Sequence, residues 1–226
     1  PMRQQVWLAK SIQTLHHLAP GRVLAGFGVG GEHPAEWQAA AAPLAGRGQR
    51  LDELLELLPA LLGGEAVEHA GELVVHTPPL EPAMSMPPIL IGGRSNAALR
   101  RAARYGDAWM TVWMDPDEIV VRRALLADMA QEEGRRAPET TMVLFVAVGA
   151  DDDECRRDAA RLYHNQYRLP WEAVASRTAC GSVRLVADQV GRYVDAGVTG
   201  FVMIPCRPDL GGQLDALAEV RAAVQW

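Results

Sequence analysis

The feature of this sequence that most restricts its possible folds is a repeated alternation of short apolar segments with amphipathic helical segments. Each apolar segment predicts a buried strand, and the segment after it has its apolar residues on one helical face. Strands that alternate with helices are typical of βα units and of a parallel sheet. The sequence therefore predicts an α/β fold with five strands, at residues 22–29, 88–92, 108–113, 141–148 and 200–205.

Two architectures contain such units, an open doubly wound sheet and a closed (β/α)₈ barrel. The segment GFGVGG at residues 26–31 follows a strand, but it lacks the acidic residue about 20 positions later at the end of a second strand. We therefore reject a dinucleotide-binding site. A closed barrel normally needs about 250 residues. Five units in 226 residues are too few to close one.

Composition limits the partners of the chain. It carries 28 acidic and 22 basic side chains, and its net charge of −6 argues against nucleic acid or an anionic membrane as the main partner. No apolar run approaches the roughly 20 residues that span a bilayer, and no signal peptide opens the sequence, so we expect a cytoplasmic protein. Cys155, Cys180 and Cys206 lack paired spacing, which predicts reduced thiols and no metal site.

The junction at residues 89–109, ILIGGRSNAALRRAARYGDAW, carries the clearest local signal. An apolar strand ends at Gly92 and Gly93, and a helical pattern begins at Asn96. A helix start leaves backbone N–H groups without intrahelical partners, and these groups suit an anion such as a phosphate. The alternative is that the two glycines serve only a tight turn between strand and helix. The residues by themselves leave both interpretations open.

Three longer segments add a resemblance that runs over essentially the whole chain. They are LAKSIQTLHHLAPGRVLAGFGVGGEHPAEWQAAAAPLAGRGQRLDELLELLPALLGGEAVEHAGE, PPILIGGRSNAALRRAARYGDAWM and ADQVGRYVDAGVTGFVMIP. In content and order they resemble the bacterial luciferase-like flavin and deazaflavin oxidoreductases. The resemblance implies one luciferase-like domain over residues 1–226, of the (β/α)₈ barrel type, with only the last five βα units and a small β insertion at residues 65–79.

The resemblance implies an oxidoreductase that moves a hydride between a cofactor and a small organic substrate. GVGGEHPAEWQAA followed by RGQRLDELLELL is most similar to the subgroup that uses coenzyme F420, an 8-hydroxy-5-deazaflavin. Members that use FMN share much of this pattern, so an FMN-dependent monooxygenase is the alternative. A non-catalytic flavin-binding relative is a third possibility. Family members usually carry three further strands, and an acid–base residue, before a segment like PMRQQVWLAK, and this sequence does not contain them.

In the family, the turn after the fifth strand of the barrel holds the cofactor phosphate at the start of the next helix. The residues of this chain that match that turn are Gly92, Gly93, Arg94, Ser95 and Asn96. Backbone N–H groups and the Ser95 hydroxyl would donate to phosphate oxygens, and Arg94 would supply positive charge.

The loop after the first strand of this chain would lie beside the deazaflavin, by the same resemblance. Its glycines Gly28, Gly30 and Gly31 would allow a flat ring to approach the backbone closely. Glu32 is the first candidate for proton transfer and His33 the second.

Two tryptophans and one strand edge complete the predictions. Trp109 and Trp113 flank a strand end, where each either walls the substrate cleft or belongs to the core. The first predicted strand would form an open sheet edge, where a barrel would continue. Exposed edges invite pairing with another chain, so we expect a homodimer or an aggregation-prone protein.

Overall fold

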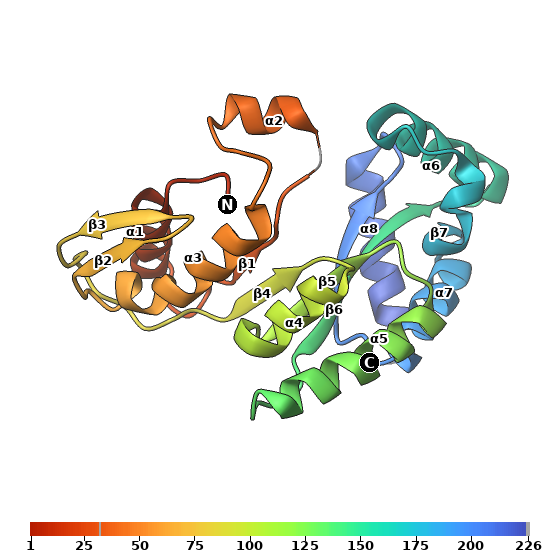
Figure 1. The fold of residues 1–226 in the computed structure, drawn as a ribbon. Coiled ribbons are helices and arrows are strands. Elements are labelled where there is room, and N and C mark those ends of the chain that lie inside the picture. The colour runs from red at the N-terminus through yellow and green to blue at the C-terminus, as the bar shows by residue number, and fades with distance from the viewer. Residues whose placement is uncertain (32, 225–226) are drawn as a thin grey trace. The chain divides into compact units, whose positions relative to one another are not determined.

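The computed structural model of the protein describes residues 1–31 and 33–224, which form two compact units (Figure 1). The first unit comprises residues 1–109 and 132–138, and the second comprises residues 110–131 and the chain from residue 139 onward. The boundary between them falls inside strand β5 (Ala108–Val112).

The first unit combines a parallel strand pair with a separate antiparallel hairpin. Strands β1 and β4 run parallel, with Phe27 opposite Ile91, and β2 and β3 pair antiparallel, with Val67 opposite Thr77. The elements of this unit are α1 (Gln5–Leu18), β1 (Ala25–Phe27), α2 (Pro34–Ala39), α3 (Arg47–Leu62), β2 (Val67–Ala70), β3 (Val74–Thr77), β4 (Ile89–Gly92) and α4 (Asn96–Tyr105). The hairpin confirms the β insertion predicted at residues 65–79.

The core of the first unit forms where α1 packs against α3. Helix α3 buries a row of leucines at helical spacing, namely Leu51, Leu54, Leu55, Leu58 and Leu61. From α1, Ala9 and Ile12 are buried on the side that packs against α3. Burial of this apolar surface holds the two helices together, because each buried methylene contributes about 0.8 kcal/mol.

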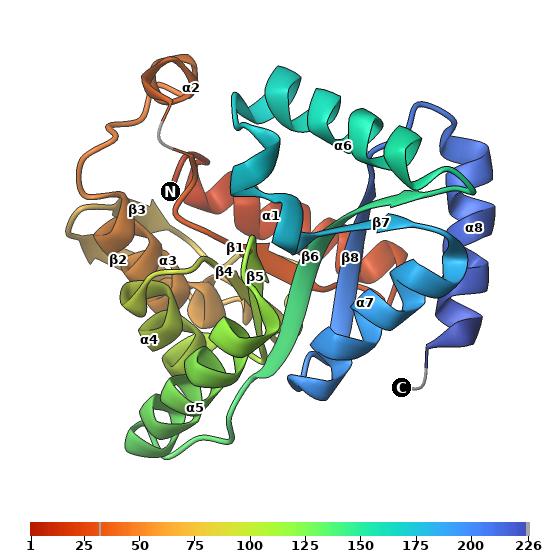
Figure 2. The same cartoon turned by 90° about the vertical axis from the view of Figure 1, so that its right-hand side faces the viewer.

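The second unit is built around one long strand, β6. Strand β6 pairs parallel with both β7 and β8. Helices α6, α7 and α8 surround these strands (Figure 2), and Phe145 and Ala147 of β6 pack against Cys155 and Tyr163 of α6. The elements are α5 (Pro116–Glu132), β6 (Glu139–Val148), α6 (Asp152–Tyr167), β7 (Thr178–Gly181), α7 (Val183–Asp195), β8 (Gly200–Pro205) and α8 (Leu210–Ala223), with 3₁₀ turns at Trp171–Ala173 and Ala175–Arg177.

All five strands predicted from the sequence are present, but the prediction missed a sixth, β7. Its four residues, TACG, contain no apolar run and no alternation long enough to indicate a strand. The strand exists because its residues pair with β6, with Phe145 opposite Thr178 and Val148 opposite Gly181. A tertiary contact therefore creates this element, and local sequence cannot reveal it.

Two glutamines fix the ends of these strands. The buried Gln213 of α8 accepts the N–H of Val148 at 2.9 Å and donates to the Val148 carbonyl at 2.8 Å. Gln189 of α7 makes the same pair of bonds to Cys180, at 3.1 and 3.4 Å. A side-chain amide carries both N–H donors and a carbonyl acceptor, so it can replace a neighbouring strand at a single residue. Helices α7 and α8 are thereby tied to the ends of β7 and β6.

We expect Gln213→Ala to lower the free energy of unfolding by roughly 1–3 kcal/mol, because it leaves the buried N–H of Val148 without an acceptor. Gln131→Ala is the matched control, since Gln131 is exposed on α5 and should change stability by less than about 0.5 kcal/mol. Urea unfolding followed by circular dichroism measures both. Equal effects of the two substitutions would show that the amide clamp does not stabilise the unit.

A half-buried carboxylate, that of Glu53, attaches the hairpin to α3. Glu53 accepts the backbone N–H groups of Leu73 at 2.8 Å and Glu72 at 3.1 Å, and it contacts His69 Nε2 at 3.0 Å. The pKa of Glu53 is lowered from 4.5 to about 2. The hydrogen bond from the Leu73 N–H is the largest cause, and the hydrogen bonds from His69 and Glu72 also contribute to this lowering. The ionised carboxylate is therefore the form that holds the hairpin turn.

The lowered pKa of Glu53 predicts a pH-dependent stability. A carboxyl group whose pKa falls on folding contributes stability above pH 4.5 and loses that contribution as the pH drops towards 2. We expect Glu53→Gln to destabilise the protein at neutral pH, and the difference from the parent to shrink between pH 4.5 and 2. Glu68→Gln, at a side chain that is 70% exposed, is the control. Urea midpoints across this pH range test the expectation, and a pH-independent difference contradicts it.

The described residues also show the state of the cysteines and whether a metal site or a membrane-spanning helix is present among them. All three cysteines lie in the second unit and are free thiols. Burial raises the pKa of Cys180 and of Cys206 to about 12, so both are protonated at neutral pH. Within the described part of the chain, no group of three His, Cys, Asp or Glu side chains is arranged to hold a metal ion, and no helix is long and apolar enough to cross a membrane.

Candidate functional site

The parallel pairing of β1 and β4 brings two of the predicted loops together. Phe27 stands opposite Ile91, so Gly28, directly after β1, lies beside Gly92, the last residue of β4. A side-chain carbon placed on Gly28 would lie 3.8 Å from the Gly92 carbonyl oxygen. Loops at the carboxyl ends of parallel strands are where α/β folds bind ligands. The candidate site therefore lies within the first unit, where these two strands end.

The turn from β4 into α4 is built around Gly93 and Ser95. Gly93 has φ +139°, and a side-chain carbon there would lie 2.7 Å from the Ala98 side chain, so both the backbone and the packing require glycine. Ser95 is the N-cap of α4 and accepts the Ala98 N–H at 3.2 Å, which leaves its hydroxyl hydrogen available to a ligand. Together with the exposed Arg94 and Asn96, the turn presents donors and positive charge at the positive end of a helix.

Trp109 fixes the backbone of this turn through a hydrogen bond. Its indole Nε1 donates to the Gly93 carbonyl at 2.7 Å, and the side chain has no exposed surface. Of the two roles that the sequence left open for Trp109, the structure shows the one in the core. Sequence reasoning missed its positioning contact, because Trp109 and Gly93 are 16 residues apart and meet only in the folded unit.

The loop after β1 is fixed by side chains of the two helices that follow it, α2 and α3. Gly30 has φ +79°, and a side-chain carbon there would lie 3.0 Å from the ring of the buried Trp37. The Gly31 carbonyl accepts hydrogen bonds from Trp37 Nε1 at 2.9 Å and from Arg47 at 2.6 Å. Contacts within the loop and the helices after it are thus sufficient to explain glycine at position 30 and the fixed position of the Gly31 carbonyl. Gly28 differs, because a side-chain carbon there would make only an ordinary van der Waals contact, with the Gly92 carbonyl oxygen at 3.8 Å.

The proton-transfer candidates are only partly described. Glu32 lies outside the described residues. His33 is exposed and precedes α2 as its N-cap, where its backbone carbonyl accepts the Glu36 N–H at 3.1 Å and its side chain makes no capping bond. The roles of both residues stay predictions.

Trp113 lies in the second unit, directly after β5. It has φ +55°, an uncommon conformation for a bulky residue, and such strain often occurs at functional sites. Its ring stacks on Phe145 with centroids 6.2 Å apart and meets the edge of Tyr167 at 5.1 Å. Tyr167 is 39% exposed, so this aromatic cluster reaches the surface. The proposed role of Trp113 in a substrate cleft stays a prediction.

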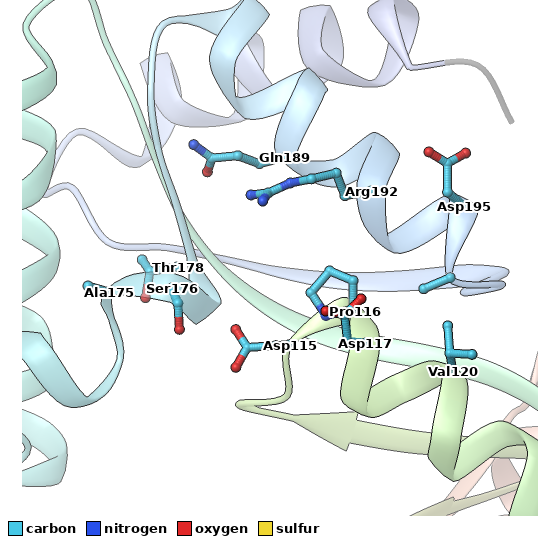
Figure 3. Close-up of a pocket in the computed structure, with 11 residues that line it drawn as sticks. Asp115, Pro116, Asp117, Val120, Ala175, Ser176, Thr178, Gln189, Arg192 and Asp195 are labelled. Carbon is cyan, nitrogen blue, oxygen red and sulfur yellow. The ribbon is translucent and has the colours of Figure 1, made fainter.

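A hollow of about 630 Å³ lies in the second unit between the start of α5 and α7 (Figure 3). Asp115 and Asp117 line one side, and Gln189 and Arg192 of α7 line another. Arg177 bridges Asp115 at 3.1 Å and Glu118 at 3.4 Å, which ties the second 3₁₀ turn to the start of α5. The sequence did not predict this hollow, and Asp115 at its rim has a structural task, the ion pair with Arg177.

We expect Trp109→Phe to lower the free energy of unfolding by roughly 1–3 kcal/mol, because the phenyl ring keeps most of the packing but leaves the Gly93 carbonyl without its donor. Trp171→Phe is the control, at a partly buried residue that packs on the core of the second unit. Thermal unfolding of the two variants measures the difference. If Trp109→Phe is no more destabilising than Trp171→Phe, the indole hydrogen bond does not hold the turn.

Residues 1–200 match the family model described as luciferase-like monooxygenase. The chain belongs to the luciferase-like monooxygenase family. It is 38% identical over 141 residues to an uncharacterized protein of Mycobacterium tuberculosis, a match that covers 61% of this chain and 48% of that protein. It is 32% identical over 169 residues to the F420-dependent hydroxymycolic acid dehydrogenase of the same organism, which covers 69% of this chain and 44% of that enzyme.

Solved structures show the same fold. An F420-dependent secondary alcohol dehydrogenase, solved in complex with an F420–acetone adduct, superposes with a TM-score of 0.85 at 19% identity. The match covers 99% of this luciferase-like chain and 76% of that structure. The chain therefore has part of the luciferase-like barrel fold, as its sequence predicted, and it spans about half the length of the curated relatives it matches.

Proposed function

We propose that this luciferase-like chain belongs to an oxidoreductase that transfers a hydride between coenzyme F420 and a small organic substrate. The observation that carries the proposal is the meeting of Gly28 with the Gly92–Asn96 turn where β1 and β4 end. The F420-dependent dehydrogenase among its relatives supports the choice of cofactor. Coenzyme F420, when bound, supplies a deazaflavin ring that accepts or donates a hydride.

The donor groups at the start of α4 fit the phosphate of such a cofactor. Ser95 has a hydroxyl hydrogen to donate, since its oxygen is already used as the helix cap. Arg94 and Asn96 are exposed on the same turn, and the end of the helix favours negative charge. Trp109 and Gly93 give the turn a fixed shape, so its donors need little reorganisation when an anion binds.

The residues of the β1 loop would orient the ring and handle protons. Gly28 carries no side chain that would stand between the backbone and a flat ring, and Trp37 and Arg47 keep the loop in place through the Gly31 carbonyl. Glu32 and His33 follow directly, and we propose that one of them exchanges a proton with the substrate.

A second candidate function is an FMN-dependent monooxygenase, which the description of the matching family favours. Both cofactors carry a phosphate that the α4 turn would suit, so the turn alone does not separate them. Fluorescence titration of the protein with F420 and with FMN decides between the two. Comparable affinity for both contradicts the preference for F420, and binding without turnover of any substrate supports the third possibility, a non-catalytic relative.

We expect Arg94→Ala to weaken F420 binding about tenfold to a hundredfold, because a charge-assisted hydrogen bond contributes roughly 1.5–3 kcal/mol. Ser95→Ala should cost a few-fold, since backbone donors stay in place. Gly93→Val should be worst, because neither the φ of +139° nor the 2.7 Å approach to Ala98 admits a side chain. Arg100→Ala is the matched control, at an exposed arginine one turn further along α4.

The same variants titrated with a dephosphorylated cofactor isolate the phosphate contacts. The loss caused by Arg94→Ala should shrink for this analogue, because only the phosphate contact is removed. If Arg94→Ala binds both forms as tightly as the parent does, the glycines form only a turn and the phosphate site lies elsewhere.

A further inference from the structure

Arg50 of α3 is a buried arginine whose charge is directed at the chain between β1 and α3. Its side chain is 5% exposed, and its guanidinium donates to the carbonyl of Ala45 at 2.6 Å and to the carbonyl of Pro43. Both carbonyls belong to the segment that returns from α2 to α3. A planar guanidinium that binds two carbonyls at once fixes their separation. Arg50 therefore sets the shape of this returning segment.

The same guanidinium lies against Trp37. Its Cζ atom is 5.9 Å from the centre of the Trp37 ring, and that side chain is buried. A cation in this position is attracted by the electrons of the indole ring. Trp37 in turn donates its Nε1–H to the Gly31 carbonyl at 2.9 Å, and its ring is what a side-chain carbon on Gly30 would meet at 3.0 Å. Arg50 thus reaches the loop after β1 through Trp37.

Arg50 is also anchored to the β2–β3 hairpin. Its Nη1 lies 3.7 Å from Oε2 of Glu72 in the hairpin turn, and the backbone N–H of Glu72 donates to Glu53 of α3 at 3.1 Å. A side-chain carbon on Gly46 would lie 2.7 Å from the Glu72 carboxylate and 3.2 Å from Arg50, so the returning segment passes close to this ion pair. The hairpin is therefore connected to the loop after β1 by way of Arg50.

Burial of this arginine carries a free-energy cost. A charge that leaves water needs partners for its donors, and among the described residues Arg50 Nε has no hydrogen-bond acceptor. An apolar side chain at this position would avoid the cost, so the buried ion pair is weak evidence for a role in stability. The other role of such a group is to fix one arrangement of the chain. Here the arrangement is that of the chain between β1 and α3.

We propose that Arg50 is a positioning residue of the candidate cofactor site, and that it holds the loop between β1 and α2 in the shape that the cofactor ring meets. The inference rests on the proposed function, because this loop begins at Gly28, beside Gly92. Arg50 itself contacts neither the ring nor the substrate. It acts through Trp37 and through the segment that returns from α2.

Hydrogen exchange of the indole N–H groups, measured by NMR, tests the hold on the loop without any cofactor. Arg50→Met keeps an unbranched side chain but removes the charge and the donors. We expect the Trp37 indole N–H to exchange about tenfold faster or more in this variant, because its bond to Gly31 opens more often. The indole N–H of Trp109, which is bonded to Gly93, should keep its rate. Trp37→Phe and Trp109→Phe assign the two signals.

Two further variants separate positioning from general stability. Arg123→Met removes a half-buried arginine of the second unit that donates to the Ala196 carbonyl at 3.2 Å, and it should leave the Trp37 signal unchanged. Arg50→Lys keeps the charge but not the planar fork, so we expect a smaller acceleration, and it carries the test if the methionine variant does not fold. Equal acceleration of Trp37 and Trp109, or an unchanged Trp37 signal in the Arg50 variants, overturns the proposal.

Titration with F420 then connects the loop to the site. We expect Arg50→Met to weaken F420 binding about three- to tenfold, because a looser loop must be ordered when the ring binds. The loss should persist with the dephosphorylated cofactor, unlike that of Arg94→Ala, since Arg50 acts on the loop and not on the phosphate. Unchanged affinity contradicts the positioning role. A parent protein that binds neither F420 nor FMN contradicts the proposed function instead, and the exchange rates still decide whether Arg50 holds the loop.

Discussion

The parallel register between β1 and β4 is the constraint on which the candidate site depends. With Phe27 opposite Ile91, the two strands end at the same level, and Gly28 emerges beside Gly92. A slip of one residue would turn every side chain of β1 to the opposite face of the strand pair. It would also carry the β1 loop away from the α4 turn. The candidate cofactor site therefore depends on a pairing of only three residues in each strand.

Buried side-chain donors then give these loops fixed shapes. Trp109 donates to the carbonyl of Gly93, and Trp37 donates to the carbonyl of Gly31. In the second unit Gln213 does the same for the last residue of β6. In each case a side chain from elsewhere in the fold satisfies a backbone group that no strand or helix partner reaches, as buried polar groups require. Such contacts pre-organise a loop before any ligand arrives.

Much of the fold followed from local patterns, because five strands and the hairpin each carry their own apolar signal. Strand β7 did not, because its residues TACG are held by contacts with distant residues, among them β6 and Gln189. At the site, the Gly92–Asn96 turn was visible in the sequence, since glycines at a strand end and a helix-capping serine are local signals. Trp109 was left undecided, because the same residue type serves a cleft wall and a core equally well.

The sequence by itself determined the βα alternation, the family and the positions of the two glycine-rich loops. These follow from residue types and spacings within short windows, which dihedral preferences and hydrophobic periodicity govern. Only the tertiary structure decided that Gly28 lies beside Gly92, that Trp109 holds Gly93, and that one apolar face of α1 is covered while the other is exposed. The reason is physical: each of these facts joins residues far apart in the chain, and only strand register and helix packing fix which of them meet.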